Sequence, residues 1–368
     1  MGFSFGFTED IEEEPQGGQQ NGNGVPAQFV NPIDNASELQ SPKLYTLQDL
    51  QRLSFAETRI TYEPVELYPG RTLYRRELFD VRHQLMMEDS TLGKKEDGVS
   101  AEEFNILMGE TGEDLKNGVY EGGLKSWECS FDMIAKLKDL QIVERLLQNG
   151  QKFNVVELGC GTSLPTLYIL SLIFSTQATQ HQPISVVLSD FNYDVLRLVT
   201  LPNILINWCF CALNPDELRL LQQRDDVEGN IRDGEIDITK AVVARFNQWM
   251  QQNQVTISFI SGSWCRSFMN ILNETLPQMK TETNIVLTSE TIYSPAILPV
   301  VGEMMVELAG GEGAAHDDSV TLLGAKDIYF GVGGSIVDCR QYLQSRGAHV
   351  ETTSAAGNFK RSVLSISI

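Results

Sequence analysis

Short apolar runs alternate with amphipathic stretches from residue 122 to the C-terminus. Four mostly apolar runs predict strands: VVEL (155–158), ISVVLSD (184–190), VTISFISGSW (255–264) and NIVLTSE (284–290). The first is expected to be buried on both faces and the second to be buried as well. Stretches with helical apolar spacing predict helices over 130–150, 163–174, 192–198, 239–252 and 296–308. The first of these begins at a capping Ser130 and ends at Gly150. This alternation predicts an α/β fold in which right-handed crossovers build a mostly parallel sheet.

The C-terminal part departs from this alternation. A strand over 321–330 and a helix over 334–347 precede two strands, 349–354 and 360–368. Because only a few residues separate these last strands, they predict an antiparallel hairpin at one edge of the sheet.

The region before residue 122 is irregular. Residues 1–40 are rich in Gly, Gln, Asn, Pro and acidic residues and predict a disordered acidic tail. Residues 41–121 predict an N-terminal extension packed on a main domain that covers 122–368. Within that domain, residues 212–254 are read as an insertion.

Charge and composition limit the partners. The chain has 49 Asp and Glu against 28 Lys and Arg, a formal net charge of −21. Such a surface disfavours direct binding to nucleic acid and favours a basic protein partner. The apolar stretch 164–174 is far shorter than the ~20 residues of a membrane span, so no membrane partner is expected.

Cysteine and histidine usage suggests no cofactor metal. The six cysteines show no framework spacing and no CxxC pair, which is typical of reduced thiols in an intracellular protein. The four histidines are scattered, so no metal site is predicted.

A glycine loop follows the first buried strand. Gly159 and Gly161 let the backbone approach a ligand at the carboxyl end of that strand. A dinucleotide fingerprint needs a third small residue where this chain has Leu164, whereas the preceding acid, Glu157, suits the cationic amino end of S-adenosylmethionine. Asp190, at the end of the second strand, can accept ribose hydroxyls of either cofactor. These residues favour the methyl donor but leave a dinucleotide open.

Several blocks, taken together, resemble one family. They are GGLKSWECSFDM (122–133), VVELGCGTSLPTL (155–167), SDFNYDVL (189–196), SGSW (261–264), TSETIYS (288–294) and AKDIYFGVGGS (325–335). The set is similar to the histidine protein methyltransferases, seven-strand enzymes with a class I, Rossmann-like sheet, and the opening MGFSFGF resembles fungal members. The resemblance implies S-adenosyl-L-methionine as methyl donor and S-adenosyl-L-homocysteine as product. It also implies methylation of the tele nitrogen of a histidine in ribosomal protein uL3, with a role in ribosome assembly or translation.

The resemblance also implies roles for residues at matching positions. The methionine end of the donor would be lined, mostly through backbone and packing, by Ser126, Trp127, Glu128, Cys129 and Ser130. The ribose and adenine would be held by Asp190, Phe191 and Asn192 and covered by Gly262, Ser263 and Trp264, with Ser289 near the donor.

Glu290 and Tyr293 occupy the slot of an acid-x-x-Tyr motif found in related lysine methyltransferases. We expect Glu290 to accept a hydrogen bond from the target imidazole N–H and Tyr293 to wall the target pocket. Imidazole titrates near pH 6.5 and is mostly neutral at pH 7, whereas a lysine near 10.4 must lose a proton at a cost of roughly 4.6 kcal/mol. A histidine enzyme therefore needs positioning more than a strong base.

Three other functions remain open on the sequence. They are lysine methylation on the same scaffold, a non-catalytic ribosome-associated binding module, and a dinucleotide oxidoreductase. If the protein is a histidine methyltransferase, we expect it to be a monomer located in the cytoplasm and nucleus.

Overall fold

The computed structural model describes residues 29–54, 58–92, 106, 121–176, 182–223, 233–310, 318–329, 331–355 and 360–368. Residues 1–28 of the predicted acidic tail lie outside this part of the chain.

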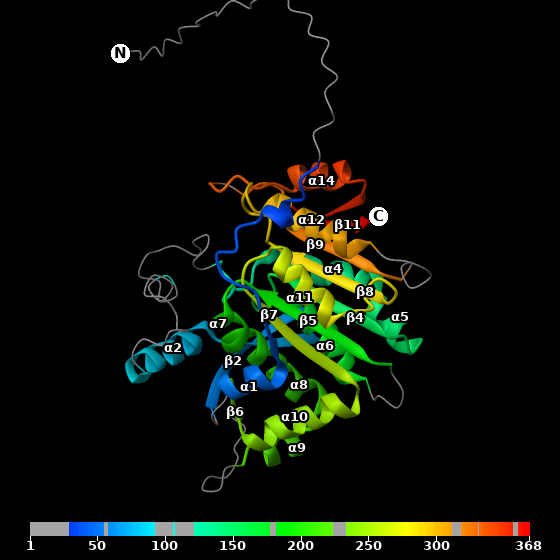
Figure 1. Cartoon of the computed structure of the whole chain (residues 1–368). Coiled ribbons are helices and arrows are strands. Elements are labelled where there is room, and N and C mark those ends of the chain that lie inside the picture. Colours follow the sequence, from blue (N-terminus) through cyan, green and yellow to red (C-terminus); the bar gives the residue numbers. More distant parts are fainter. Residues whose placement is uncertain are drawn as a thin grey trace, which may run out of the picture.

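An eight-stranded sheet forms the centre of the molecule, with strand order β1-β7-β5-β4-β8-β9-β11-β10 (Figure 1). Its strands are β1 (Lys43–Thr46), β4 (Phe153–Leu158), β5 (Ile184–Asp190), β7 (Val255–Ser261), β8 (Thr283–Ser289), β9 (Val320–Lys326), β10 (His349–Ser354) and β11 (Arg361–Ser367). The five strands from β7 to β9 run parallel, and β11 is antiparallel to both β9 and β10. The predicted α/β sheet with a terminal hairpin is therefore confirmed. The antiparallel edge strand β1 was not predicted.

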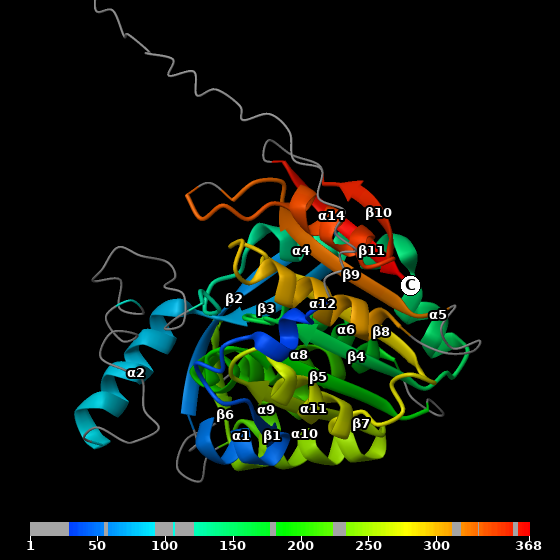
Figure 2. The same ribbon diagram turned by 45° about the horizontal axis from the view of Figure 1, so that its top comes forward.

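Helices cover both faces of the sheet (Figures 1 and 2). One face packs against α4 (Glu128–Leu140), α5 (Ile142–Gln148), α6 (Leu164–Ser175), α8 (Leu201–Ala212) and α10 (Lys240–Gln252). The other packs against α11 (Arg266–Thr275), α12 (Leu298–Ala309) and α14 (Ile336–Ser345). Successive strand residues serve opposite faces, so Val155 lies in the first core and Val156 in the second. This two-sided burial explains why the strands are continuous apolar runs.

The predicted helix over 130–150 is two helices. Gln141 adopts a left-handed conformation (φ 48°) that ends α4 and begins α5. The prediction that Ser130 caps the first helix is wrong, because α4 begins at Glu128 and Ser130 lies within its first turn. Gly150 follows α5 with φ 60°, as a helix terminator does.

The helix predicted over 192–198 continues much further. It comprises α7 (Tyr193–Val195), a π-helical turn η2 (Leu196–Thr200) and α8, whose second residue is Pro202. The run Tyr193–Ala212 contains an 18-residue window with a mean hydropathy of 1.5 and is long and apolar enough to cross a membrane, so it is a longer apolar stretch than 164–174. Since 83% of its apolar window is buried inside the fold, we assign it as a core helix.

A second, three-stranded sheet has the order β3-β2-β6. It joins β2 (Thr58–Tyr68) and β3 (Arg71–Arg76) of the N-terminal extension to β6 (Glu235–Ile238) of the predicted insertion. The insertion also contributes α9 (Pro215–Leu221), and the extension contributes α1 (Leu47–Ser54) and α2 (Leu78–Leu92). In both views α2 projects from the body of the molecule (Figures 1 and 2).

An asparagine fixes this small sheet to the main domain. The side chain of Asn207 on α8 accepts a hydrogen bond from Tyr74 N at 3.0 Å and donates one to Tyr74 O at 2.6 Å. It thus satisfies both backbone groups of a β3 residue, as a neighbouring strand would.

Residues 29–40, which we call the N-terminal strap, differ from the predicted disordered tail. They include the short helix η1 (Pro32–Asn35) and lie against the main domain. Ile33 is buried in the same core as α12, and Asn31 donates hydrogen bonds to Glu303 and Glu307 of that helix. The strap has a polar composition, but one buried apolar anchor and paired polar side chains hold it in place.

Candidate active site

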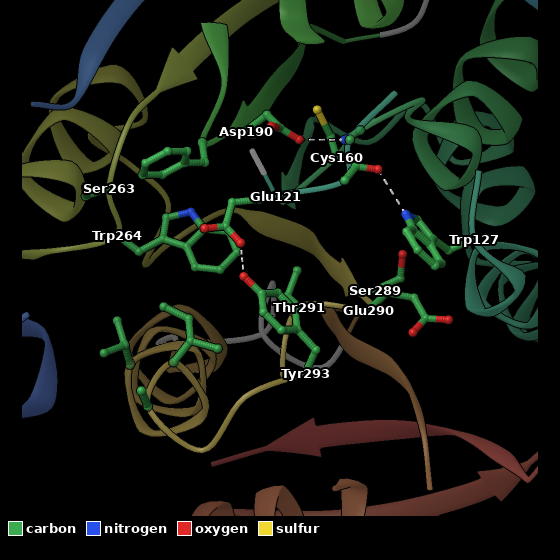
Figure 3. Close-up of a pocket in the computed structure, with 18 of the residues that line it drawn as sticks. Glu121, Trp127, Cys160, Asp190, Ser263, Trp264, Ser289, Glu290, Thr291 and Tyr293 are labelled. Carbon is green, nitrogen blue, oxygen red and sulfur yellow. Dashed lines mark hydrogen bonds between the residues drawn. The ribbon is translucent and has the colours of Figure 1, made fainter. Parts of the chain in front are cut away.

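A cavity of about 650 Å³ opens where the carboxyl ends of β4, β5, β7 and β8 meet (Figure 3). This is where open α/β sheets bind ligands. Of the predicted site residues, twelve line it: Trp127, Ser130, Gly159, Gly161, Asp190, Phe191, Gly262, Ser263, Trp264, Ser289, Glu290 and Tyr293. Five predicted residues do not line it: Ser126, Glu128, Cys129, Glu157 and Asn192.

The glycine loop after β4 leaves no room for side chains. Gly159 has φ 63°, and a Cβ there would stand 2.6 Å from Thr291 Cγ2. Gly161 has φ 50°, and its Cβ would meet the carbonyl oxygen of Gly123 at 3.0 Å. Both glycines are therefore required by conformation and by the close approach of neighbouring segments.

Asp190 is the last residue of β5. Its carboxylate accepts hydrogen bonds from Gly161 N at 3.0 Å and from Asn192 N at 3.1 Å. Burial raises the pKa of Asp190 to about 7, with the nearby Glu121 carboxylate adding to the effect and the backbone hydrogen bonds opposing it. Asp190 lines the cavity.

Glu157 does not reach the cavity, so the expected contact with the amino end of a methyl donor is not where the structure places this residue. Its buried carboxylate accepts hydrogen bonds at 3.2 Å from Ser163 Oγ and Thr166 N, at the start of α6. Burial raises the pKa of Glu157 to about 7, although these hydrogen bonds oppose that rise. The acid therefore caps the helix that follows the glycine loop.

Two side chains of the SWECS segment (126–130) reach the cavity. Trp127 and Ser130 line the cavity, and Trp127 Nε1 donates to Gly122 O at 3.1 Å. Ser126 bonds Thr162, and Cys129 is fully buried.

Two more of the predicted residues that do not line the cavity bond to residues that do. Glu128 pairs with Lys326 at 3.3 Å, and the side chain of Asn192 accepts a hydrogen bond from Glu121 N at 3.1 Å.

The Glu290 carboxylate is held by protein groups. Oε2 accepts a hydrogen bond from Tyr329 Oη at 2.6 Å, and Oε1 accepts one from Cys129 N at 3.4 Å and lies 4.0 Å from Lys326 Nζ. Glu290 itself has φ 59°, an uncommon conformation for a residue with a side chain. Glu290 lines the cavity as predicted, and its carboxylate also joins the β8 loop to the start of α4.

Aromatic side chains and the strap form the remaining walls. Trp264 Nε1 is buried and has no hydrogen-bond partner among the residues that the structure describes. The strap reaches this region because Ser263 and Gln40 exchange two hydrogen bonds of 2.9 Å. A Cβ on Gly262 would stand 2.8 Å from Pro42 Cα, so this loop also needs a glycine.

Three features of the site were not predicted. Glu121 lines the cavity and accepts a hydrogen bond from Tyr293 Oη; the only sequence signal was an acid directly before the GGLK block. Tyr329 and Lys326 also line the cavity. They belong to the AKDIYF block, which resembles the family but to which no functional role was assigned. Leu39 and other strap residues line the cavity from a segment predicted to be disordered.

Comparison with known proteins identifies the family. The chain is 34% identical to "Histidine protein methyltransferase 1" of Saccharomyces cerevisiae, over the whole of this chain and 98% of the relative. The chain belongs to the histidine protein methyltransferase family.

Other histidine protein methyltransferases match over smaller shares. The Schizosaccharomyces pombe relative is 32% identical over 93% of this chain and 85% of its own length. The "Histidine protein methyltransferase 1 homolog" of Bos taurus is 30% identical over 63% of this chain and 51% of its own. No protein-family model matches the chain.

Solved structures similar to this histidine protein methyltransferase are distant. The glycopeptide N-methyltransferase MtfA is 12% identical over 61% of this chain and 94% of its own, with a TM-score of 0.29. Magnesium protoporphyrin IX methyltransferase from Synechocystis, with bound SAM, is 10% identical over 78% of this chain and 98% of its own, with a TM-score of 0.25. The fold assignment therefore rests on the strand order and directions of the sheet itself.

Proposed function

We propose that the protein transfers a methyl group from S-adenosyl-L-methionine to a histidine side chain of a protein substrate, leaving S-adenosyl-L-homocysteine. The observation that carries this is the cavity described above, which joins the glycine loop and Asp190 to an aromatic and acidic wall, in a chain of the histidine protein methyltransferase family.

The cavity walls fit a nucleoside donor. The side-chain-free surface of Gly159 permits close approach, and Asp190 supplies carboxylate oxygens for ribose hydroxyls. The buried Trp264 Nε1, without a partner among the described residues, can donate to an adenine nitrogen. When bound, the donor supplies an electrophilic methyl group on a sulfonium. The protein's part is to align a neutral imidazole nitrogen with that methyl group.

We propose ribosomal protein uL3 as the substrate and the tele nitrogen as the methylated atom, in support of ribosome assembly or translation. Family membership supports the choice of histidine. The net charge of −21 suits a basic substrate such as a ribosomal protein. A monomer working in the cytoplasm and nucleus is part of the same proposal.

Incubation of the purified protein with tritiated donor and recombinant uL3, followed by peptide mapping, tests this function. We expect label on one histidine and little label with the Asp190→Asn variant, which loses the ribose carboxylate. Label on lysine would establish the lysine alternative. No label on uL3 or, in a parallel incubation, on fractionated ribosomal proteins, with donor still bound in calorimetry, would favour a non-catalytic binding module. Saturable binding of NAD in place of the donor would indicate an oxidoreductase.

A further inference from the structure

Glu121 stands at the junction of two parts of the cavity. Its backbone N–H donates to the side chain of Asn192, two residues beyond Asp190 at the carboxyl end of β5. Its carboxylate Oε2 accepts a hydrogen bond from Tyr293 Oη, beyond the end of β8. Residues 172 positions apart thus meet inside the cavity, as Figure 3 shows. This contact connects the expected ribose end of the site to the wall predicted to face the target.

The other acid in this wall is directed elsewhere. Both oxygens of Glu290 have protein donors, Tyr329 Oη and Cys129 N, and the side chain is only 7% exposed. In Figure 3 its carboxylate points away from the Glu121–Tyr293 pair. A buried tyrosine hydroxyl and a backbone N–H thus each occupy an acceptor position of the Glu290 carboxylate and hold it in this direction.

Resting on the proposed function, we propose that the Glu121 carboxylate, positioned by Tyr293, accepts a hydrogen bond from the N–H of the target imidazole. In a neutral imidazole one nitrogen carries the proton and the other carries the lone pair. A carboxylate that accepts a hydrogen bond from the N–H fixes the tautomer, that is, which ring nitrogen carries the proton. It also directs the lone pair of the other nitrogen toward the methyl group. Glu121 is thereby the substrate-orienting residue, and Tyr293 positions its carboxylate.

The chemistry of the transfer also favours a carboxylate here. The imidazole lone pair forms the new N–C bond while the C–S bond of the donor breaks and its electron pair stays on sulfur. The positive charge of the sulfonium moves to the imidazole ring, which becomes a methylimidazolium still carrying its N–H proton. Glu121 stabilises this developing charge and takes the proton, which then passes to water. Product histidine leaves neutral, and the carboxylate is restored.

Regiospecificity provides a test that a purely structural role would not affect. We compare wild type, Glu121→Gln and Tyr293→Phe on recombinant uL3, measuring kcat at saturating donor, donor Kd by calorimetry, and the ratio of tele- to pros-methylhistidine after hydrolysis. We expect Glu121→Gln to lower kcat roughly 100-fold and Tyr293→Phe roughly 10-fold. Donor Kd should change less than about threefold, and both variants should yield a mixture of isomers where wild type yields one.

Glu290→Gln serves as the matched acid variant. It is expected to keep a single product isomer, because its carboxylate faces Tyr329 and α4. Tyr293→Phe keeps the ring and its packing, so the proposal stays testable if Glu121→Gln folds poorly.

Two results would overturn the inference while leaving the proposed function intact. One is a Glu121→Gln enzyme with wild-type kcat and a single isomer. The other is a large rise in donor Kd with kcat preserved at saturation, which would make Glu121 a donor ligand. Failure of the wild-type protein to methylate any histidine would instead overturn the proposed function, and with it this inference.

Discussion

Substitution of Gly159 by alanine should separate backbone strain from steric contact in the glycine loop. At φ 63° an alanine costs about 1 kcal/mol relative to glycine. Its Cβ would also stand 2.6 Å from Thr291 Cγ2 and 3.3 Å from Trp264 Cη2, distances that force a shift. Overpacking of this kind costs about 1–3 kcal/mol. We therefore expect Gly159→Ala to lower the free energy of unfolding by about 2–4 kcal/mol.

Gly347 provides a matched control, because it has φ 87° and nothing within 4 Å of a built Cβ. Gly347→Ala should carry only the conformational cost of about 1 kcal/mol. Adding Thr291→Ser to Gly159→Ala removes the clashing methyl group but keeps a hydroxyl to bond Thr288, so it should recover the steric part of the loss.

Urea denaturation measures these free energies, and calorimetry measures donor affinity. We expect the donor Kd to rise about tenfold or more in Gly159→Ala and to stay raised in the double variant, since the new Cβ still lies 3.3 Å from Trp264 Cη2 in the cavity wall. The reasoning fails if Gly159→Ala is no less stable than Gly347→Ala, or if it binds the donor as wild type does.

Three further predictions concern the donor, the strap and the small sheet. Because burial raises the pKa of Asp190 to about 7, its carboxylate becomes protonated as the pH falls from 8 to 6. The donor Kd should therefore rise roughly tenfold over this range, and a Kd that does not change with pH would contradict the prediction. Ile33→Ala should cost about 2–4 kcal/mol in urea denaturation, whereas Val30→Ala, 65% exposed, should cost under about 0.5; equal effects would argue against an anchored strap. Asn207→Ala should lower the free energy of unfolding by about 1–3 kcal/mol, because Tyr74 N and O lose their partner. An unchanged urea midpoint would show that Asn207 does not hold the small sheet to the main domain.

Local patterns gave the architecture of the main sheet. Apolar runs such as VVEL had to be buried on both faces, and two closely spaced final strands had to pair antiparallel, so the parallel sheet and its hairpin followed from the sequence. The same holds for Gly159 and Asp190, whose places after successive strands put them at the same edge of the sheet.

Predictions failed where one residue's role depends on a distant partner. Glu157 was expected in the cavity, but its side chain turns toward the start of α6, where Ser163 Oγ and Thr166 N donate hydrogen bonds to it. Glu290 lines the cavity, but the sequence carried no signal that Tyr329, 39 positions later, donates a hydrogen bond to its carboxylate. Helical or strand periodicity carries no information about such pairs.

The sequence by itself determined the alternation of strands and helices, the glycine turn and the acid after the second strand, because these depend on local periodicity and backbone conformation. Only the tertiary structure decided that the strap lines the cavity, that β6 of the insertion joins β2 of the extension, and that Glu121 meets Tyr293. Those contacts join segments far apart in the chain, and their geometry is fixed only when both faces of the sheet are packed.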